Sequence, residues 1–518
     1  MKPIFKQIGG LLVLLGGLML LPMVVSLIYG ELYSTVGFLV SSAVTALVGF
    51  AIQKTYNNAP DPYNKHALII AAMGWLSIAI MGAIPFFLTA HITPQEVAMS
   101  FVPDGKDYDP SLWNFKNPLH ALFESMSAYT TTGLTMATHE PSVGKGLLFY
   151  RSLAQWIGGC GFIVLSLAIL RQNPGQGILH LYGSEYSGDK LKPNIIGTAR
   201  AIWKIYLGLT VFAFLYLFIG GVIILPDYGI GKMAFDAVNH AMTGQATGGF
   251  STLDDSIAGF NSKAIEYLHY LPMIMGALSM PFYFKLFSER QIKIIWQNVQ
   301  SAALFTGSIF GGILLVFFLT TSLGVVNPWQ EGYFQYISGL TTTGWQTSDI
   351  GSWSSQAIIF IVCGALIIGG AAGSTAGGIK LIRASVIARG VWWHINKHFL
   401  PKDAIQTIHF DKKSFSPNYM NKWLAEVAIF AFLYLTFILF GTLITLHFNG
   451  GDFTMADAFF ESASAQGTVG LSTGITSPDM SSTTEIFYIF QMWTGRLEIF
   501  PVLALLRSLL FGMRMIKF

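Results

Sequence analysis

The sequence predicts an all-α integral membrane protein, with four copies of one helical repeat and two further transmembrane helices at the N-terminus. Three observations support this fold class. Of the 518 residues, 53% are hydrophobic and only 11% are charged, which is too little polar surface to cover a soluble globule. The apolar residues come in runs long enough to cross a bilayer. Between these runs, a segment rich in Thr and Gly recurs four times.

Ten apolar runs reach the roughly 20 residues that a helix needs to cross about 30 Å of hydrocarbon. The first follows Lys2 and Lys6, is long for a signal-peptide core and lacks a clean small-residue cleavage site, so we expect a retained helix. The first two runs form a separate N-terminal pair within residues 1–60. The ten expected crossings are 8–29, 34–52, 67–89, 147–170, 204–225, 264–287, 301–324, 355–379, 424–447 and 485–512.

Lys and Arg are distributed unevenly between the two sides of this arrangement. If the N-terminus is cytoplasmic, 23 of the 30 basic residues fall on the inner side or at inner helix ends, and both termini lie inside. Arg496 alone lies in mid-helix. This bias is typical of the positive-inside pattern and predicts that orientation. The six basic residues on the outer side are Lys106, Lys116, Lys145, Arg151, Lys232 and Lys263.

The recurring segment aligns on one glycine in each copy: Gly133, Gly249, Gly344 and Gly470. A short amphipathic stretch precedes each copy, and about ten helical residues rise only about 15 Å, half the bilayer. Each unit is therefore predicted to be a helix, a half-length helix, a loop and a helix. The copies read SMSAYTTTGLTM, AMTGQATGGFST, YISGLTTTGWQT and SASAQGTVGLST, within repeats spanning 61–175, 200–290, 298–395 and 420–518.

Loop backbone at membrane depth is stable only where protein shields it or where it lines an aqueous cavity. Four loops around one pseudo-fourfold axis would meet this condition together, because their carbonyl oxygens could replace the water shell of a cation. The half-length helices would then be pore helices, with the negative ends of their dipoles toward the ion. Ordinary connecting loops are the alternative, but four aligned copies favour an ion filter. The expected filter residues, which would bind the cation, are Thr131, Thr132, Gly133, Thr247, Gly248, Gly249, Thr342, Thr343, Gly344, Thr468, Val469 and Gly470.

Two features lie on the inner side of the expected filter. Residues 369–378, GGAAGSTAGG, place five glycines in an apolar run, which indicates a break because each costs a helix about 1 kcal/mol against Ala. Close helix packing is the alternative. Arg496 is an intramembrane charge, and we expect it to face the pore as a barrier to cations. A structural Arg bound to Glu498 or to loop carbonyls is the other interpretation.

These segments together resemble the Trk-type potassium uptake proteins, in the TrkH/TrkG branch of the superfamily that also contains KtrB and the HKT transporters. The resemblance covers nearly the whole chain. The two helices before residue 60 favour TrkH/TrkG over KtrB. Trp345 departs from the smaller residue expected after the third glycine. Besides the four loops, the resemblance is carried by RSLAQWIGGCGFIVL, FDAVNHAMTGQATGGFST, IGGAAGSTAGGIKLIR and GRLEIFPVLALL.

The resemblance implies potassium selectivity with one glycine per loop, and a homodimer in the bacterial inner membrane. It also implies a cytoplasmic nucleotide-binding regulatory subunit of the TrkA kind. The Gly-rich stretch would be a gate loop beneath the filter. The expected gate residues are Gly369, Gly370, Gly373, Ser374, Thr375, Gly377, Gly378 and Arg496.

The expected function is potassium uptake through a gated pore, with potassium bound at the filter and no organic cofactor. A proton- or sodium-coupled potassium symporter is the alternative. A coupled carrier would usually need a membrane-embedded carboxylate, and the candidates form no obvious relay. No nucleophile–base pair suggests an enzyme, and nothing suggests nucleic-acid binding. The candidate carboxylates are Glu124, Asp236, Glu461 and Glu498.

The remaining His and Cys residues suggest no metal site. Cys160 and Cys363 lie inside apolar runs and indicate neither a disulfide nor a thiolate site. His394 and His398 are four residues apart but lack an obvious third zinc ligand, and a wet cytoplasmic loop is favoured. His120 and His240 are expected to precede pore helices as capping or packing residues.

Overall fold

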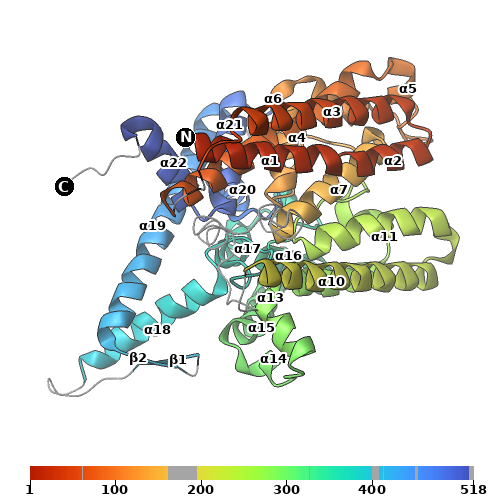
Figure 1. The fold of residues 1–518 in the computed structure, drawn as a ribbon. Helices are drawn as coiled ribbons and strands as arrows, with labels where there is room; N and C mark the ends of the chain where they lie inside the picture. Colours follow the sequence, from red (N-terminus) through yellow and green to blue (C-terminus); the bar gives the residue numbers. More distant parts are fainter. Residues whose placement is uncertain are drawn as a thin grey trace.

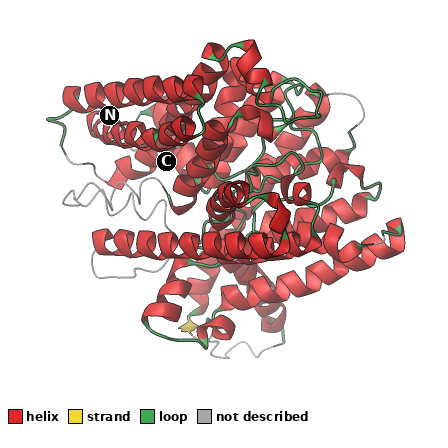
Figure 2. Cartoon of the chain, turned by 90° about the vertical axis from the view of Figure 1, so that its right-hand side faces the viewer, coloured by secondary structure: helices red, strands yellow, loops and turns green. Residues whose placement is uncertain are grey.

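The computed structural model is helical almost throughout, which confirms the predicted fold class (Figure 2). Strand occurs, within the described residues, as one antiparallel hairpin of β1 (Ile408–Phe410) and β2 (Lys413–Phe415). The described residues are 1–60, 62, 64–161, 195–325, 327–399, 408–411, 413–449 and 453–512.

The N-terminal pair is built from α1 (Lys2–Leu18), α2 (Leu20–Ile28) and α3 (Leu32–Thr55). Glycines allow α1 and α3 to approach closely. A Cβ on Gly9 would lie 2.7 Å from the carbonyl oxygen of Gly49, and the hydroxyl of Ser42 donates to the carbonyl of Gly16 at 2.7 Å. Small residues are what close helix contact in lipid requires.

The first two repeats begin with long helices and continue through short ones. Repeat 1 consists of α4 (Asn64–Ile92), α5 (Gln95–Met99), the 3₁₀ turn η1 (Ser111–Lys116), α6 (Pro118–Tyr129), η2 (Glu140–Val143) and α7 (Lys145–Cys160). Repeat 2 consists of α10 (Ile195–Ile224), η3 (Pro226–Tyr228), α11 (Ile230–Gln245), η4 (Ser256–Phe260), α12 (Lys263–Ala277), α13 (Met280–Tyr283) and the π-helical turn η5 (Phe284–Ser288). Residues 162–175, which we assigned to repeat 1, lie outside the described residues.

The last two repeats have the same plan. Repeat 3 consists of α14 (Ile294–Gln297), α15 (Val299–Phe318), η6 (Leu319–Leu323), η7 (Trp329–Tyr333), α16 (Phe334–Leu340), η8 (Ile350–Ser352), α17 (Gln356–Ile368) and α18 (Leu381–Lys397). Repeat 4 consists of α19 (Pro417–Phe448), α20 (Met455–Gly467), α21 (Ser482–Arg496) and α22 (Phe500–Phe511).

Contacts between repeats close a ring around the short helices α6, α11, α16 and α20. Within each repeat the first long helix packs on the short helix: α4 on α6, α10 on α11, α15 on α16, and α19 on α20. Each following helix packs on the short helix of the next repeat: α7 on α11, α12 on α16, α17 on α20, and α21 on α6. The last of these contacts joins repeat 4 to repeat 1, so the contacts between successive repeats form a closed cycle.

Among the described residues, six of the ten expected crossings are helical stretches apolar and long enough to span a bilayer. The first of these is Lys2–Ile28 and the last is Pro417–Phe448. The other four were expected as crossings, but their helices α7, α12, α17 and α21 stop after 13 to 16 residues. We predicted a break only for the Gly-rich stretch. In repeats 2, 3 and 4 the chain becomes helical again within a few residues, at Met280, Leu381 and Phe500, so an interruption is common to these three repeats.

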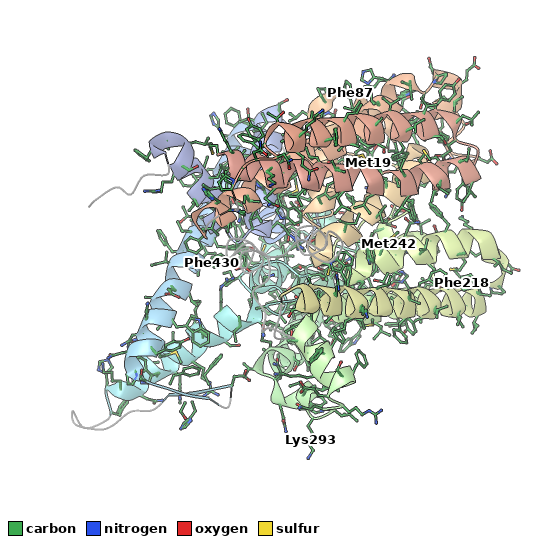
Figure 3. The ribbon with its side chains drawn as sticks, in the orientation of Figure 1. Met19, Phe87, Phe218, Met242, Lys293 and Phe430 are labelled. Carbon is green, nitrogen blue, oxygen red and sulfur yellow. The ribbon has the colours of Figure 1, made fainter. Side chains whose placement is uncertain are left out.

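The N-terminal pair lies against repeat 1 and is labelled along the upper edge of Figure 1, where α1 and α3 run beside α4. Met19, at the junction of α1 and α2 within this layer, is fully buried (Figure 3). The helices α18 and α19 extend away from the bundle and carry the β1–β2 hairpin, and the start of α1 lies near α22 at the same end (Figure 1). The fold therefore places all four loops at the centre of the bundle.

One carboxylate joins the N-terminal pair to repeat 1, and its removal should lower stability. Glu31, just before α3, accepts the backbone N–H groups of Lys145 at 2.5 Å and Gly146 at 3.0 Å, at the N-terminus of α7. Glu31→Ala should lower the free energy of unfolding by about 1 kcal/mol, the usual value of a helix cap. Unfolding in detergent measures this, with the exposed Glu96→Ala as control. Equal stability of the two variants would contradict the capping role.

Candidate functional site

The four Thr/Gly segments share one backbone conformation. A Thr with φ between 49° and 58° is followed two residues later by a glycine with φ between 77° and 94°. The residue between them does not have positive φ. Positive φ costs a β-branched residue roughly 1–3 kcal/mol, so the surrounding structure must impose it. These residues, which we call the hydroxyl layer, are Thr131, Thr247, Thr342 and Thr468.

The four aligned glycines meet in a closed ring, which we call the glycine ring. A Cβ on any of them would lie 2.1–2.2 Å from the carbonyl oxygen of the residue that precedes the next repeat's glycine. The contacts run from repeat 1 to 2, 2 to 3, 3 to 4 and 4 back to 1. Because any side chain would strike the neighbouring loop, only glycine fits. The ring is Gly133, Gly249, Gly344 and Gly470, and the oxygens belong to Gly248, Thr343, Val469 and Thr132.

Hydroxyl groups inside the half-length helices hold three members of the glycine ring. The backbone N–H groups of Gly133, Gly344 and Gly470 each donate to a serine Oγ at 3.0 Å. Repeat 2 differs, because the hydroxyl of Thr243 donates to the carbonyl of His240 in its own helix. The second loop is therefore held in another way. The three serines, aligned in the sequence without an assigned role, are Ser127, Ser338 and Ser464.

A second set of polar side chains holds the chain as it leaves the ring. Nine residues before each ring glycine stand Glu124, His240, Gln335 and Glu461, all buried. Glu124 and Glu461 accept backbone N–H groups of their own outgoing loops at 2.9 Å, from Met136 and Thr473. His240 Nε2 lies 3.1 Å from the hydroxyl of Ser251, and Gln335 donates to the carbonyl of Ser348 at 3.2 Å. Our sequence reasoning missed this role, although the aligned frame places a polar residue there in every copy.

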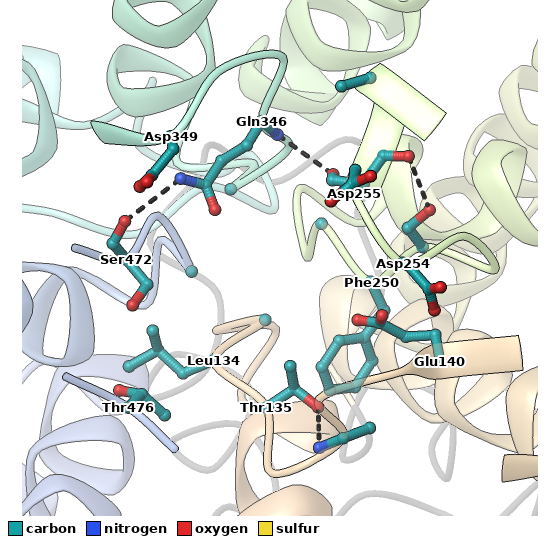
Figure 4. A pocket seen from close by; sticks show the side chains of 18 of the residues that line it. Leu134, Thr135, Glu140, Phe250, Asp254, Asp255, Gln346, Asp349, Ser472 and Thr476 are labelled. Carbon is teal, nitrogen blue, oxygen red and sulfur yellow. Dashed lines mark hydrogen bonds between the residues drawn. The ribbon is translucent and has the colours of Figure 1, made fainter. Parts of the chain in front are cut away.

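A cavity of 530 Å³, which we call the outer cavity after the orientation predicted from the sequence, has all four ring glycines in its lining (Figure 4). Carboxylates from three repeats surround it: Glu140, Asp254, Asp255 and Asp349. Gln346 joins the loops around the cavity, because its side chain donates to the carbonyl of Ser472 at 3.2 Å (Figure 4). Negative charge around a narrow cavity raises the local concentration of cations.

The Gly-rich stretch, which we call the inner loop, lies directly against the hydroxyl layer from the other side. The chain breaks at Ile368 and becomes helical again at Leu381, with Gly369, Gly373 and Gly378 at positive φ. Gly377 donates its N–H to the hydroxyl of Thr342 at 2.7 Å. The hydroxyl of Thr375 accepts from that of Thr247 at 3.1 Å and donates to the carbonyl of Gly276 at 2.9 Å.

Other members of the inner loop complete its attachment. Ala371 donates its N–H to the carbonyl of Ala277 at 3.0 Å, and the carbonyl of Gly373 accepts from Met280 at 2.9 Å. Gly370 accepts from Leu381 at 2.9 Å, and Ser374 donates its hydroxyl to the carbonyl of Ala371 at 2.6 Å. These bonds fill the gap left by the helix breaks of repeats 2 and 3, so the inner loop is an ordered element.

Arg496 lies at the end of α21 and joins the inner loop to the first Thr/Gly segment. Its guanidinium donates to the carbonyl of Thr375 at 2.9 Å, to the hydroxyl of Thr131 at 3.2 Å and to the carbonyls of Gly158 and Gly159, the latter at 2.9 Å. The loop-carbonyl contact that we held as the alternative is therefore present. The charge is also close to the hydroxyl layer, which receives contacts from the inner loop in repeats 2 and 3.

Three neighbouring charged residues lie at the inner loop or its flanks: Lys380, Arg383 and Glu498. Lys380 follows the loop, and its ammonium donates back to the carbonyl of Ala376. Glu498 pairs with Arg383 of α18. Arg383 also lies over the ring of Phe430 at 4.2 Å. The break after α21 and the start of α18 are thus joined.

Several side chains lie elsewhere than expected. His120 and His240 are inside the helices α6 and α11 rather than before them, and His394 is in α18 rather than in a loop. The helices extend further because their apolar faces are buried against neighbouring helices. Trp345 is fully buried and points behind the ring, where a Cβ on Gly244 would lie 2.4 Å from its ring. The described residues contain no group of three or more His, Cys, Asp or Glu that could hold a metal ion.

These features define a multi-pass, membrane-embedded protein in which four loops meet at one ring between an acidic outer cavity and an inner loop. A family model described as a cation transport protein, TrkH, matches residues 37–511. The chain therefore belongs to the TrkH family of cation transport proteins. This membership confirms the family that the sequence indicated, and it confirms a transporter rather than an enzyme.

Individual relatives align with nearly the whole chain. An uncharacterized cation transporter of Methanocaldococcus jannaschii is 30% identical over 99% of this chain and 97% of its own. The Trk system potassium uptake protein TrkH of Escherichia coli K12 is 28% identical over 97% of this chain and 98% of its own. The crystal structure of the potassium transporter TrkH from Vibrio parahaemolyticus matches with a TM-score of 0.79 at 26% identity, covering 98% of this chain and 99% of that one.

External pH should alter cation entry through one carboxyl group of the outer cavity. Burial raises the pKa of Glu140 to about 8, although Arg151 at 4.0 Å opposes the rise. The group gains its negative charge as the pH rises from 7 to 9. Uptake at low ionic strength should then rise about twofold, because a unit charge about 10 Å away in water is worth roughly 0.4 kcal/mol. Glu140→Gln should abolish the step in tracer uptake, and persistence of the step would exclude this group.

Proposed function

We propose that this protein takes up potassium across the cytoplasmic membrane through a gated pore whose selectivity filter is formed by the four Thr/Gly segments. The closed glycine ring is the observation that carries the proposal. Its neighbouring carbonyls come from four loops that share one pattern of positive φ, and each oxygen lies against the ring glycine of an adjacent loop. Such carbonyls replace the hydration shell of a desolvated cation. The names of the relatives from Escherichia coli and Vibrio parahaemolyticus favour potassium as that cation.

The ion would enter from the acidic outer cavity and meet the glycine ring first. Thr132, Gly248, Thr343 and Val469 would supply carbonyls at the ring, and the hydroxyl layer would follow on the inner side. The four half-length helices direct their C-terminal ends toward this point, which favours a positive ion. The chain's own groups would thus both attract and dehydrate the ion.

The inner loop and Arg496 would form the gate. Three residues of the hydroxyl layer are already engaged from the inner side: Thr247 and Thr342 by the loop, and Thr131 by Arg496. A positive charge and a bonded loop at this position oppose cation passage. Opening would require the inner half of the broken helix, α18, to move and draw the loop aside.

Orientation and partners follow the same reasoning. The basic residues favour a cytoplasmic location for both termini, and α18, α19 and the β1–β2 hairpin would then project toward the cytoplasm. We propose that a cytoplasmic nucleotide-binding subunit of the TrkA kind acts there, on a homodimer of this chain. Relatives are named as parts of a "Trk system", and this name supports a partner of this kind.

Substitution of one ring glycine by Ser tests the filter. The new Cβ would lie 2.1–2.2 Å from the neighbouring carbonyl oxygen and would displace it. The potassium-to-sodium permeability ratio should fall roughly tenfold, taking the weakened contact as about 1.4 kcal/mol. Gly231→Ser is the control, because nothing lies within 4 Å of a Cβ there. Unchanged ratios in all four single variants, measured in liposomes, would exclude the filter.

The same liposomes separate a pore from a coupled symporter. With potassium as the only gradient, a pore conducts, whereas a proton- or sodium-coupled carrier requires its second ion. Potassium flux that depends strictly on a proton or sodium gradient would favour the symporter.

Loss of the gate should raise resting flux without changing ion preference. Arg496→Ala removes the bonds of the guanidinium to Thr375 of the inner loop, to Thr131 and to the carbonyls of Gly158 and Gly159, and shortening 369–378 by a few residues disrupts the loop. Both variants should conduct more potassium than wild type in the absence of a partner subunit. Lys293→Ala, at an exposed position far from the ring, is the control (Figure 3). Wild-type flux in both variants would leave the loop as a packing feature.

A further inference from the structure

Gln155 is a buried residue of α7 in repeat 1 whose side chain reaches the loop of repeat 2. Its Nε2 donates to the carbonyl of Gly248 at 2.5 Å, and its Oε1 accepts the backbone N–H of Phe250 at 3.1 Å. An amide has one donating and one accepting end, so two bonds of opposite sense fix which way it faces. Gln155 therefore holds the backbone on both sides of the ring glycine Gly249.

Repeat 2 needs such a clamp more than the other repeats do. Its loop has two consecutive glycines, Gly248 and Gly249, where the others carry Thr132, Thr343 or Val469 before the ring glycine. Consecutive glycines give the backbone its greatest freedom. Repeat 2 also lacks the serine bond that holds the other ring glycines, because Thr243 donates within its own helix. The two bonds from Gln155 supply the missing restraint.

The amide and the extra glycine are complementary in shape. A Cβ on Gly248 would lie 2.4 Å from Cδ of Gln155. Any side chain at position 248 would therefore displace the amide. This contact explains why the second copy reads ATGG where two others read TTTG.

Repeats 2 and 4 have no equivalent amide. A Cβ on Gly158, Gly276 or Gly495 would in each case strike the carbonyl of the residue four positions before a ring glycine, so these three glycines are equivalent. Three residues before them stand Gln155, Met273 and Met492, all buried. A thioether cannot donate a hydrogen bond. Among the described residues, the carbonyls of Thr132, Thr343 and Val469 accept no hydrogen bond.

We propose that Gln155 is a positioning residue that determines ion discrimination by clamping the repeat-2 segment of the filter, an inference that rests on the proposed pore. A carbonyl oxygen has two lone pairs, so Gly248 can accept the amide and still face an ion. Its direction is then fixed, and its field on the ion is weaker than that of the three free carbonyls. The number and field strength of the carbonyls govern selectivity. The ring is thus asymmetric at a defined position.

Gln155→Met tests the clamp by installing the residue of repeats 2 and 4. The potassium-to-sodium permeability ratio should fall about fivefold, the size expected from one hydrogen bond. The permeability ratio should fall further in Gln155→Glu, because a carboxylate still accepts the N–H of Phe250 but cannot donate to the carbonyl of Gly248. Gln491→Met is the matched control. Its buried amide donates to Ser462 and Phe437, away from the ring, so its ratio should stay at the wild-type value.

A double variant separates positioning from mere folding defects. Gly248→Thr alone should lose selectivity, because the new side chain strikes Gln155. The double variant Gln155→Met with Gly248→Thr places Met and Thr at the positions where neighbouring repeats already carry them. It should regain most of the wild-type potassium-to-sodium permeability ratio. A double variant no better than Gly248→Thr would overturn the proposal, as would a folded Gln155→Met with the wild-type ratio. If Gln155→Met fails to fold, the double variant decides. A wild-type protein that conducts no potassium would instead overturn the pore itself.

Discussion

The close approach of four backbone segments at the glycine ring is the constraint on which the rest of the structure depends. A carbonyl or N–H group at membrane depth must find a partner within the protein or face water. The ring meets this requirement because each loop is shielded by the next, at distances that leave no room for a Cβ. Positive φ at four Thr residues is the energetic cost of this arrangement, and the half-length helices, the buried serines and the carboxylates Glu124 and Glu461 hold it in place.

The broken helices follow from the same constraint. Continuous helices after each loop would pass beneath the ring and leave its inner side sealed by apolar side chains. All four instead stop at that level, which leaves backbone carbonyls such as those of Gly158, Gly159 and Gly276 for Arg496 and Thr375 to engage. The N-terminal pair is connected to the ring through α7. Glu31 caps the N-terminus of α7, and Gln155 of the same helix contacts the second loop. Stability at the outer surface and geometry at the ring are therefore connected through one helix.

The repeats and the inner loop could be predicted because their signals are local: a shared frame around Gly133, Gly249, Gly344 and Gly470, and five glycines in ten residues. We did not predict the breaks after Cys160, Ala277 and Arg496, although Gly158, Gly159 and Gly161 surround the first of them. The other two lack a glycine cluster, and their apolar residues continue on both sides of the break. The clamp by Gln155 was also beyond the sequence, because it depends on which repeat follows which around the axis. The polar position nine residues before each ring glycine could have been predicted in part. The aligned sequences show a polar residue there in every copy, but its type varies: Glu124, His240, Gln335 and Glu461.

The central claim is that the glycine ring binds a dehydrated cation on its axis. Crystals of the protein soaked in a heavy potassium surrogate such as Rb⁺ or Tl⁺ test it most directly, because anomalous scattering locates the ion without a model of the pore. The account predicts anomalous density on the axis, between the carbonyls of Thr132, Gly248, Thr343 and Val469, which disappears when Na⁺ replaces the surrogate. Density confined to the outer cavity, or an empty axis in crystals that hold the surrogate elsewhere, would contradict it.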